Sequence, residues 1–249
     1  MNVRSGGDWA ASVERLAMNC LRTEQQRQPG ALGQRAALVI DRFEFACRRT
    51  SSVDAMTQKN LNGQLRIAVV IGSVRKPRLA DPLAAWLERE LTAMDWLDRD
   101  MIDLATVSLP MHEMQPGGAA ASPIGDRLAN ADGFVFLTPE YNHSFPAPVK
   151  NAIDWHFTEW AYKPVSFVGY GASGGIRAVE QLRTVFPELR ATTVRESVLI
   201  SMAWEHLDAD GRFVPPPGTA QALHAMMNEL RTWARALRSL PITDLAGRR

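Results

Sequence analysis

From residue 64 onward, short apolar runs alternate with amphipathic segments, and this alternation limits the possible folds more than any other feature of the sequence. The first run, Leu65–Ile71, is rich in β-branched residues and lacks polar alternation, which is typical of a parallel strand buried on both faces. Further strands are expected near residues 100–104, 133–137, 165–169 and 194–200, and helices near 123–129, 146–160, 174–185 and 219–240. Five strands that alternate with helices predict an α/β fold with a parallel, doubly wound sheet.

A helix is also expected directly after the first strand and its loop. Asp81 is a suitable N-cap residue, and Pro82 suits the first helical position. Apolar residues then recur at helical spacing from Leu83 to Met94, which indicates one buried face.

Residues 1–63 differ in composition from the rest of the chain. They are rich in Arg and Gln and show apolar periodicity only in patches, so we expect a disordered or loosely helical N-terminal extension before a single domain over residues 64–245. Two alternatives stay open, a misassigned start with Met56 as the initiator and a targeting or partner-binding arm. Acidic residues from Asp8 to Glu44 count against a mitochondrial targeting segment.

Charge and cysteine content exclude several functions. The 28 basic and 27 acidic residues nearly balance, which argues against nucleic acid or an anionic membrane as a partner. No apolar stretch is long enough to span a bilayer and no secretory signal is present, so a cytoplasmic location is expected. Both cysteines, Cys20 and Cys47, lie in the first fifth of the chain, so redox chemistry downstream would need a cofactor.

The first of three polar loops, Gly72–Arg78, follows the first strand. A glycine permits close backbone approach, Ser73 offers a hydroxyl, and Arg75, Lys76 and Arg78 supply positive charge near a helix N-terminus. The loop lacks the ending of a triphosphate-binding P-loop and has one glycine instead of the three of a dinucleotide fingerprint. It therefore favours a terminal phosphate group, with a solvated turn as the alternative.

The second loop opens the segment Thr138–Trp155, after the expected strand at 133–137. Tyr141 offers a flat face and Asn142 offers amide hydrogen bonds, while nearby prolines restrict the backbone. Such a loop suits a planar heteroaromatic ligand. The alternative is that Tyr141 packs on the core and Asn142 caps a turn; the apolar residues of the following helix are interpreted as core or subunit contacts.

The third loop, Gly169–Gly175, again connects a strand to a helix. Its four glycines permit close approach of the backbone to a flat ring. Ser173 between Gly171 and Gly175 also matches the nucleophile elbow of serine hydrolases, which would need an acid and a histidine such as Asp208 with His206 or His224. No oxyanion segment precedes the serine, which disfavours this alternative. All three loops follow parallel strands and are expected at one sheet edge.

Together the three loops resemble the NAD(P)H-dependent FMN reductase family, which has a flavodoxin-like fold. The matching segments are IGSVR at 71–75, TPEYN at 138–142, PVKNAIDW at 148–155, GYGASGG at 169–175 and RAVEQLR at 177–183. The resemblance covers about residues 65–200. It implies a three-layer α/β/α sandwich with strand order 2-1-3-4-5.

The resemblance also implies which residues bind the cofactor. Ser73, Arg75 and Arg78 would hold the FMN phosphate, with Arg78 in the more variable part of the loop. Pro139, Glu140, Tyr141 and Asn142 would line the ribityl chain and the ring edge, and Gly171, Ala172 and Ser173 would approach the pyrimidine side of the ring. A homodimer or homotetramer is implied, with the helix Lys150–Trp155 near the interface.

The activity implied is hydride transfer from NADPH or NADH through FMN to a flavin, quinone or similar acceptor, by a ping-pong mechanism. No catalytic side chain is required, and the histidines of the chain show no metal-ligand spacing. A flavin-binding electron carrier or sensor is a second possibility. Carriers of the flavodoxin type are usually strongly acidic, and a net charge of +1 does not support that role.

Overall fold

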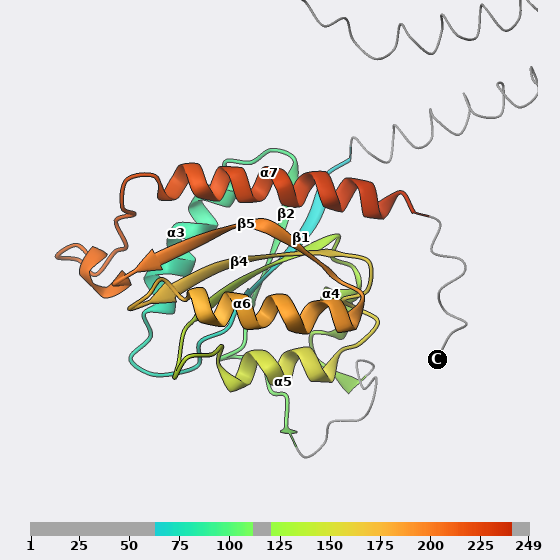
Figure 1. The fold of residues 1–249 in the computed structure, drawn as a ribbon, viewed down its shortest axis with the longest axis horizontal. Helices are drawn as coiled ribbons and strands as arrows, with labels where there is room; N and C mark the ends of the chain where they lie inside the picture. The colour runs from blue at the N-terminus through green and yellow to red at the C-terminus, as the bar shows by residue number, and fades with distance from the viewer. Residues whose placement is uncertain (1–62, 112–120, 241–249) are drawn as a thin grey trace, which may run out of the picture. The chain divides into compact units, whose positions relative to one another are not determined.

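The computed structural model describes residues 63–111 and 121–240. The predicted extension therefore lies outside the described residues except for Gly63, as do residues 241–245 of the predicted domain. The described residues form a five-stranded parallel sheet in the order β2-β1-β3-β4-β5, flanked by helices on both faces (Figure 1). The predicted fold class and strand order are confirmed.

Apolar, β-branched sequence forms the centre of this sheet. The central strands β1 (Leu65–Ile71), β3 (Gly133–Pro139) and β4 (Pro164–Gly171) are buried along nearly their whole length. The outer strands β2 (Leu97–Asp103) and β5 (Thr192–Ser201) are partly exposed, because each has a neighbour on one side only. All four pairings are parallel, so every strand ends at the same edge of the sheet.

Helices cover the two faces of the sheet and separate two cores. On one face, α3 (Ala80–Thr92) and α7 (Thr219–Arg238) bury their apolar sides in a common core, and Figure 1 shows α7 above the sheet. The other face carries α4 (Gly125–Ala129), α5 (Ala147–Trp155) and α6 (Ile176–Val185). The short 3₁₀ turns Phe186–Leu189 and Ala203–His206 flank β5.

Several predicted boundaries differ from the structure by two or more residues, including those of β2, α3 and α5. Strand β2 begins at Leu97, three residues before the expected start. Helix α3 begins at Ala80 with Leu79 as its N-cap, so Asp81 lies in the first turn instead of capping it. Helix α5 ends at Trp155, because His156 adopts an extended backbone that lets Trp160 turn into the core.

Trp160 explains why the shorter α5 is favourable. Its ring is fully buried and lies 4.7 Å from the ring of Phe134, edge to face. Its indole nitrogen donates to the carbonyl of His156 at 3.0 Å. Among the described helices, none is long and apolar enough to cross a membrane.

Candidate functional site

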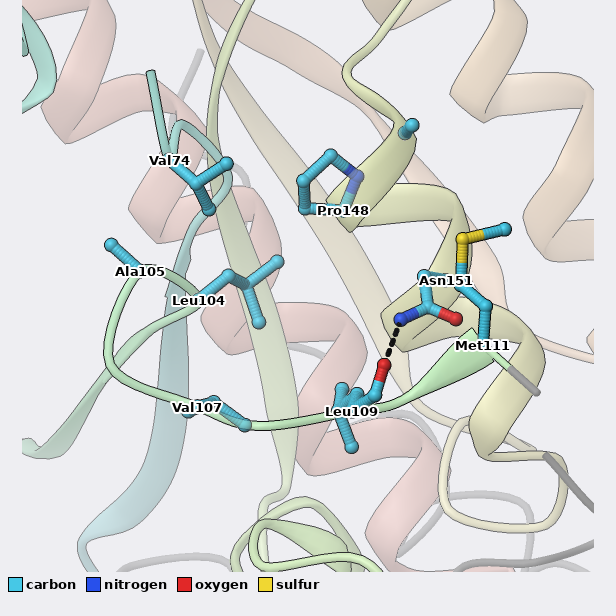
Figure 2. A pocket seen from close by; sticks show the side chains of 9 residues that line it. Val74, Leu104, Ala105, Val107, Leu109, Met111, Pro148 and Asn151 are labelled. Carbon is cyan, nitrogen blue, oxygen red and sulfur yellow. Dashed lines mark hydrogen bonds between the residues drawn. The ribbon is translucent and has the colours of Figure 1, made fainter. Parts of the chain in front are cut away.

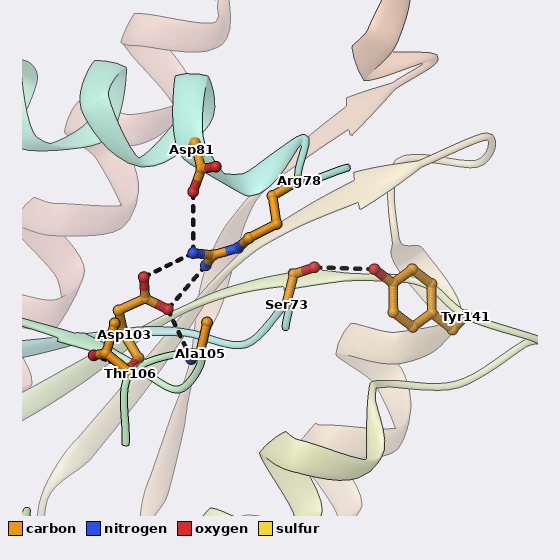
Figure 3. A network of polar contacts seen from close by, with 7 residues as sticks. All are labelled: Ser73, Arg78, Asp81, Asp103, Ala105, Thr106 and Tyr141. Carbon is orange, nitrogen blue, oxygen red and sulfur yellow. Dashed lines mark hydrogen bonds and ion pairs between the residues drawn. The ribbon is translucent and has the colours of Figure 1, made fainter. Parts of the chain in front are cut away.

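The loop after β1 meets the loop after β3 through a pair of hydroxyl groups. Ser73 is only 2% exposed, and its Oγ lies 3.0 Å from the phenolic oxygen of Tyr141 (Figure 3). The guanidinium of Arg75 lies over the Tyr141 ring, 5.5 Å from its centre. Beneath them, burial raises the pKa of the Tyr170 phenol, which keeps it neutral. Ser73, Arg75 and Tyr141 thus form one cluster.

Arg78 lies in the same loop, but its side chain is held elsewhere. Its guanidinium makes a two-bond fork with Asp103 at the end of β2, with both distances 2.8 Å, and an ion pair with Asp81 at 3.1 Å (Figure 3). The hydrogen bond to Asp103 raises the pKa of Arg78, and the side chain is only 10% exposed. Two carboxylates thus bind this guanidinium, and the phosphate role expected for Arg78 stays a prediction.

The second loop is a tight hairpin. The backbone NH groups of Tyr141 and Ser144 donate to each other's carbonyl oxygens at 2.8 and 3.1 Å. Asn142 and His143 between them have positive φ angles of 49° and 71°, a conformation that Asn tolerates well. From α6, Gln181 donates to the His143 carbonyl at 2.8 Å and accepts from the Ser144 hydroxyl. Helix α6 therefore holds the hairpin in place through Gln181.

The third loop presents backbone instead of side chains. Gly171 ends β4 with a φ of 146°, and Ala172 and Ser173 after it are exposed. Gly174 and Gly175 follow with φ angles of 71° and 77° and lead into α6, with Gly175 as its N-cap. Because these angles are costly for other residues, the glycines are needed for the shape of this turn.

An ion pair joins the second loop to the third. The carboxylate of Glu140 accepts from the backbone NH of Arg177 at 3.0 Å and from its guanidinium at 2.6 Å. The same guanidinium donates to Ser173 Oγ at 3.2 Å. Burial acts to raise the pKa of Glu140, but the hydrogen bonds from Arg177 outweigh it and leave that pKa lowered.

An apolar pocket of about 340 Å³ adjoins the first loop (Figure 2). It lies between Val74, the N-terminal end of α5 and the loop after β2, and is lined by side chains that include Leu104, Val107, Pro148 and Asn151. The amide of Asn151 donates to the Leu109 carbonyl at 2.6 Å, which ties α5 to that loop. None of the predicted cofactor residues lines this pocket.

The predicted site residues thus gather at one edge of the sheet. The first two loops meet through Ser73 and Tyr141, and the last two through Glu140 and Ser173 by way of Arg177. Arg177 and Gln181 lie in the RAVEQLR segment that resembles the family, but neither was given a role from the sequence. The signal was present, because they are polar residues four apart at the start of a helix that follows a glycine-rich loop.

The sequence profile of the NADPH-dependent FMN reductase family matches residues 65–205, which include all three loops. An NAD(P)H-dependent FMN reductase from Schizosaccharomyces pombe is 35% identical over 140 residues, which cover 52% of this chain and 70% of the relative. A 2-hydroxy-1,4-benzoquinone reductase from a Burkholderia species is 31% identical over 182 residues, with 69% of this chain and 97% of the relative covered.

Among solved structures, the chain is similar to FerB of Paracoccus denitrificans, a flavoenzyme described as an NAD(P)H:(acceptor) oxidoreductase. The TM-score is 0.54 and the identity 26%, with 69% of this chain and 98% of FerB covered. Fold, loop geometry and sequence agree, and the chain belongs to the NADPH-dependent FMN reductase family.

Proposed function

We propose that the three loops at the carboxyl edge of the sheet hold FMN, and that the chain passes a hydride from NAD(P)H through this FMN to a quinone or similar acceptor. The observation that carries the proposal is the convergence of a hydroxyl and cation cluster at the end of β1 with a glycine turn at the end of β4. The hydroxyl and cation cluster suits a phosphate group, and the glycine turn suits a flat ring.

The donors at the end of β1 fit a phosphate dianion. Ser73 offers a hydroxyl, and Arg75 offers an exposed guanidinium whose partner among the described residues is the Tyr141 ring. The N-cap of α3 makes no side-chain hydrogen bond, so the amides of its first turn have no such partner. Arg78 would support this loop by binding Asp103.

The turn after β4 fits the edge of a flat, polar ring. The half-buried Gly171 and the exposed Ala172 and Ser173 have small side chains, so their backbone amide groups can be approached closely. The Tyr141–Ser144 hairpin, with Asn142 exposed at its tip, forms the facing wall. Pro139 and Glu140 would then contribute backbone and support, because the Glu140 carboxylate is bound to Arg177.

FMN, when bound, supplies the chemistry of hydride acceptance and donation. The protein's part is to bind, orient and stabilise. Backbone amides near Gly171 and Asn142 would stabilise negative charge on the ring edge, because they lie in fixed turns and need no rearrangement. No side chain has to take or give a proton in the hydride step.

The acceptor, assembly and location go beyond the family assignment. A quinone acceptor is supported by the Burkholderia relative, which is named a benzoquinone reductase. A homodimer or homotetramer with α5 near the interface, and a cytoplasmic location, stay predictions from the sequence.

A serine hydrolase is poorly supported. Within the part of the chain that the structure describes, Ser173 Oγ bonds with Arg177 and has no hydrogen bond to a histidine. Arginine keeps its proton in proteins and cannot act as the general base. A flavin-binding carrier and an enzyme can be distinguished by steady NAD(P)H oxidation, which only the enzyme carries out.

The test is the visible spectrum and turnover of the purified protein. We expect flavin absorption, release of FMN on denaturation, bleaching by NAD(P)H without oxygen, and steady NAD(P)H oxidation with benzoquinone. Protein that remains colourless after incubation with FMN would refute the proposal. Bleaching without turnover would identify a carrier.

The phosphate assignment has its own test in Arg75→Ala. Loss of one charge-assisted hydrogen bond, about 1.5–3 kcal/mol, should weaken FMN binding by roughly tenfold to a hundredfold. Binding of riboflavin, which has no phosphate, should hardly change. Titration of apoprotein followed by flavin fluorescence measures both, and an equal loss for the two flavins would contradict the assignment.

A further inference from the structure

We infer that Glu140 and Arg177 are positioning residues that lock the second and third loops into one cradle for the cofactor, an inference that rests on the proposed FMN site. Neither side chain is then a flavin ligand. The resemblance assigned Glu140 to the ribityl chain and ring edge and gave Arg177 no role. In the structure, however, the Glu140 side chain binds Arg177.

The contact has the form of a clamp between segments far apart in the sequence. Both carboxylate oxygens of Glu140 are bound by Arg177, one by its backbone NH at 3.0 Å and the other by its guanidinium at 2.6 Å. The backbone NH of Glu140 also donates to the Tyr170 carbonyl at 3.0 Å. Glu140 is therefore fixed to both the start of α6 and the end of β4.

The cradle is completed by close packing and by a second contact one helical turn later. A Cβ built on Gly171 would lie 3.6 Å from the Cβ of Glu140, so the two loops touch at this point. Gln181, four residues after Arg177, binds the hairpin at His143 and Ser144. One side of α6 thus holds the whole hairpin against the glycine turn.

Burial makes the pair more than a surface contact. The Glu140 side chain is only 10% exposed, whereas that of Arg177 is 43% exposed. A carboxylate in such a place needs its partner, because an unpaired buried charge is costly. Without Arg177, Glu140 must either turn toward water, which opens the hairpin, or take up a proton.

The protonation of Glu140 should therefore depend on whether Arg177 is present, and this can be tested by varying the pH. The charged group that faces Glu140 from α6 is Arg177, and the titratable group on its own hairpin is His143. Paired with Arg177, Glu140 stays ionised to a lower pH than an ordinary glutamate, because its pKa is lowered. In Arg177→Met burial is opposed by the weaker attraction of His143 but no longer by the Arg177 guanidinium, so proton uptake by Glu140 moves to higher pH.

The first experiment is hydrogen exchange in apoprotein, which does not depend on the flavin. The amide of Arg177 donates to the Glu140 carboxylate, so Glu140→Ala should speed its exchange at least tenfold. The matched control is Arg238→Met, which removes an ion pair with Asp132 of similar exposure at the other edge of the sheet. Unchanged exchange in Glu140→Ala would overturn the inference.

The second experiment is FMN titration of the same proteins. Arg177→Met should weaken FMN binding roughly tenfold or more, Arg177→Lys should recover part of the loss, and Arg238→Met should bind like wild type. Binding to Arg177→Met should also fall as the pH is lowered through the mildly acidic range, more steeply than in wild type. Glu140→Gln added to Arg177→Met should remove that extra dependence, and His143→Asn should leave it.

The outcomes separate this inference from the proposed function. Wild-type protein that takes up no FMN refutes the proposed function and the inference with it. Wild-type protein that binds FMN, with Arg177→Met binding equally tightly at every pH, refutes the inference alone. An extra pH dependence that persists without Glu140 would also refute it, because another group would then be responsible.

Discussion

At the scale of single residues, the candidate site depends on backbone conformations that few side chains allow. Five residues of the second and third loops have positive φ angles: Asn142, His143, Gly171, Gly174 and Gly175. Gly175 is the most constrained of the glycines, because a Cβ there would lie 2.6 Å from the Tyr170 nitrogen and 2.9 Å from the Gly169 carbonyl carbon. Both atoms belong to the backbone, so no side-chain movement can make room for the added Cβ.

Gly175→Ala should therefore destabilise the protein by about 3–5 kcal/mol, in the range of the largest single substitutions. The matched control is Gly211→Ala, which has a similar φ of 75° but no atom within 4 Å of the added Cβ. It should cost about 1–2 kcal/mol, the conformational term alone. Urea unfolding of both variants measures the difference, and equal losses would show that the backbone overlap is relieved.

At the scale of elements, the short helix α4 depends on a side chain from outside. Lys163, just before β4, donates from its Nζ to the carbonyls of Leu128 and Ala129 at 2.9 and 2.7 Å. The ammonium also lies 5.6 Å from the centre of the Phe134 ring. Burial lowers the pKa of Lys163 to about 8, although Asp132 and Glu159 oppose the shift.

The lowered pKa predicts how stability changes with pH. In the unfolded chain Lys163 releases its proton near pH 10.5, and in the native chain near 8. Between these values the unfolded state binds more protons, so the unfolding free energy attributable to Lys163 rises with pH. Below pH 8 both states are protonated and this contribution is constant.

The comparison that isolates this effect is wild type against Lys163→Met. Between pH 8 and 10.5 the free energy of unfolding of wild type, relative to that of the variant, should rise by an amount of the order of 1–3 kcal/mol. Urea titrations at pH 7, 9 and 10 measure it. A difference that does not vary with pH would mean that the native ammonium is as well solvated as the unfolded one.

At the scale of the whole molecule, an exposed aromatic ring lies just after α5. Val149, Ile153 and Trp155 of this helix are buried in the core, but Phe157 beyond its end is 51% exposed. An exposed aromatic next to a helix expected at a subunit interface is a reasonable anchor for a second copy.

Phe157→Lys should convert the expected homodimer or homotetramer to a smaller species, because a charge would be buried in place of an apolar contact. Light scattering after size exclusion measures this against the chain mass of 27.6 kDa. Trp233→Lys, on α7 across the sheet and 41% exposed, is the control and should leave the assembly intact. A wild-type monomer, or a variant of unchanged mass, would contradict the prediction.

The sequence determined the parts of this protein that depend on local pattern. Apolar β-branched runs and helical periodicity predicted five strands and the helices between them, because these patterns reflect which faces are buried. Parallel strands share a carboxyl edge, so the sequence also predicted that Ser73, Tyr141 and Ser173 would lie at one edge. The motifs of the three loops then indicated the family.

Tertiary structure decided which charged groups meet. Arg75 and Arg78 stand three residues apart in one basic loop, yet Asp103 of the neighbouring strand binds Arg78, whereas Arg75 lies over the Tyr141 ring. Likewise the partner of Glu140 lies 37 residues away, on a helix whose orientation follows from the packing of the sheet. Sequence patterns record burial and turn conformation; the pairing of long side chains depends on distances that only the folded chain sets.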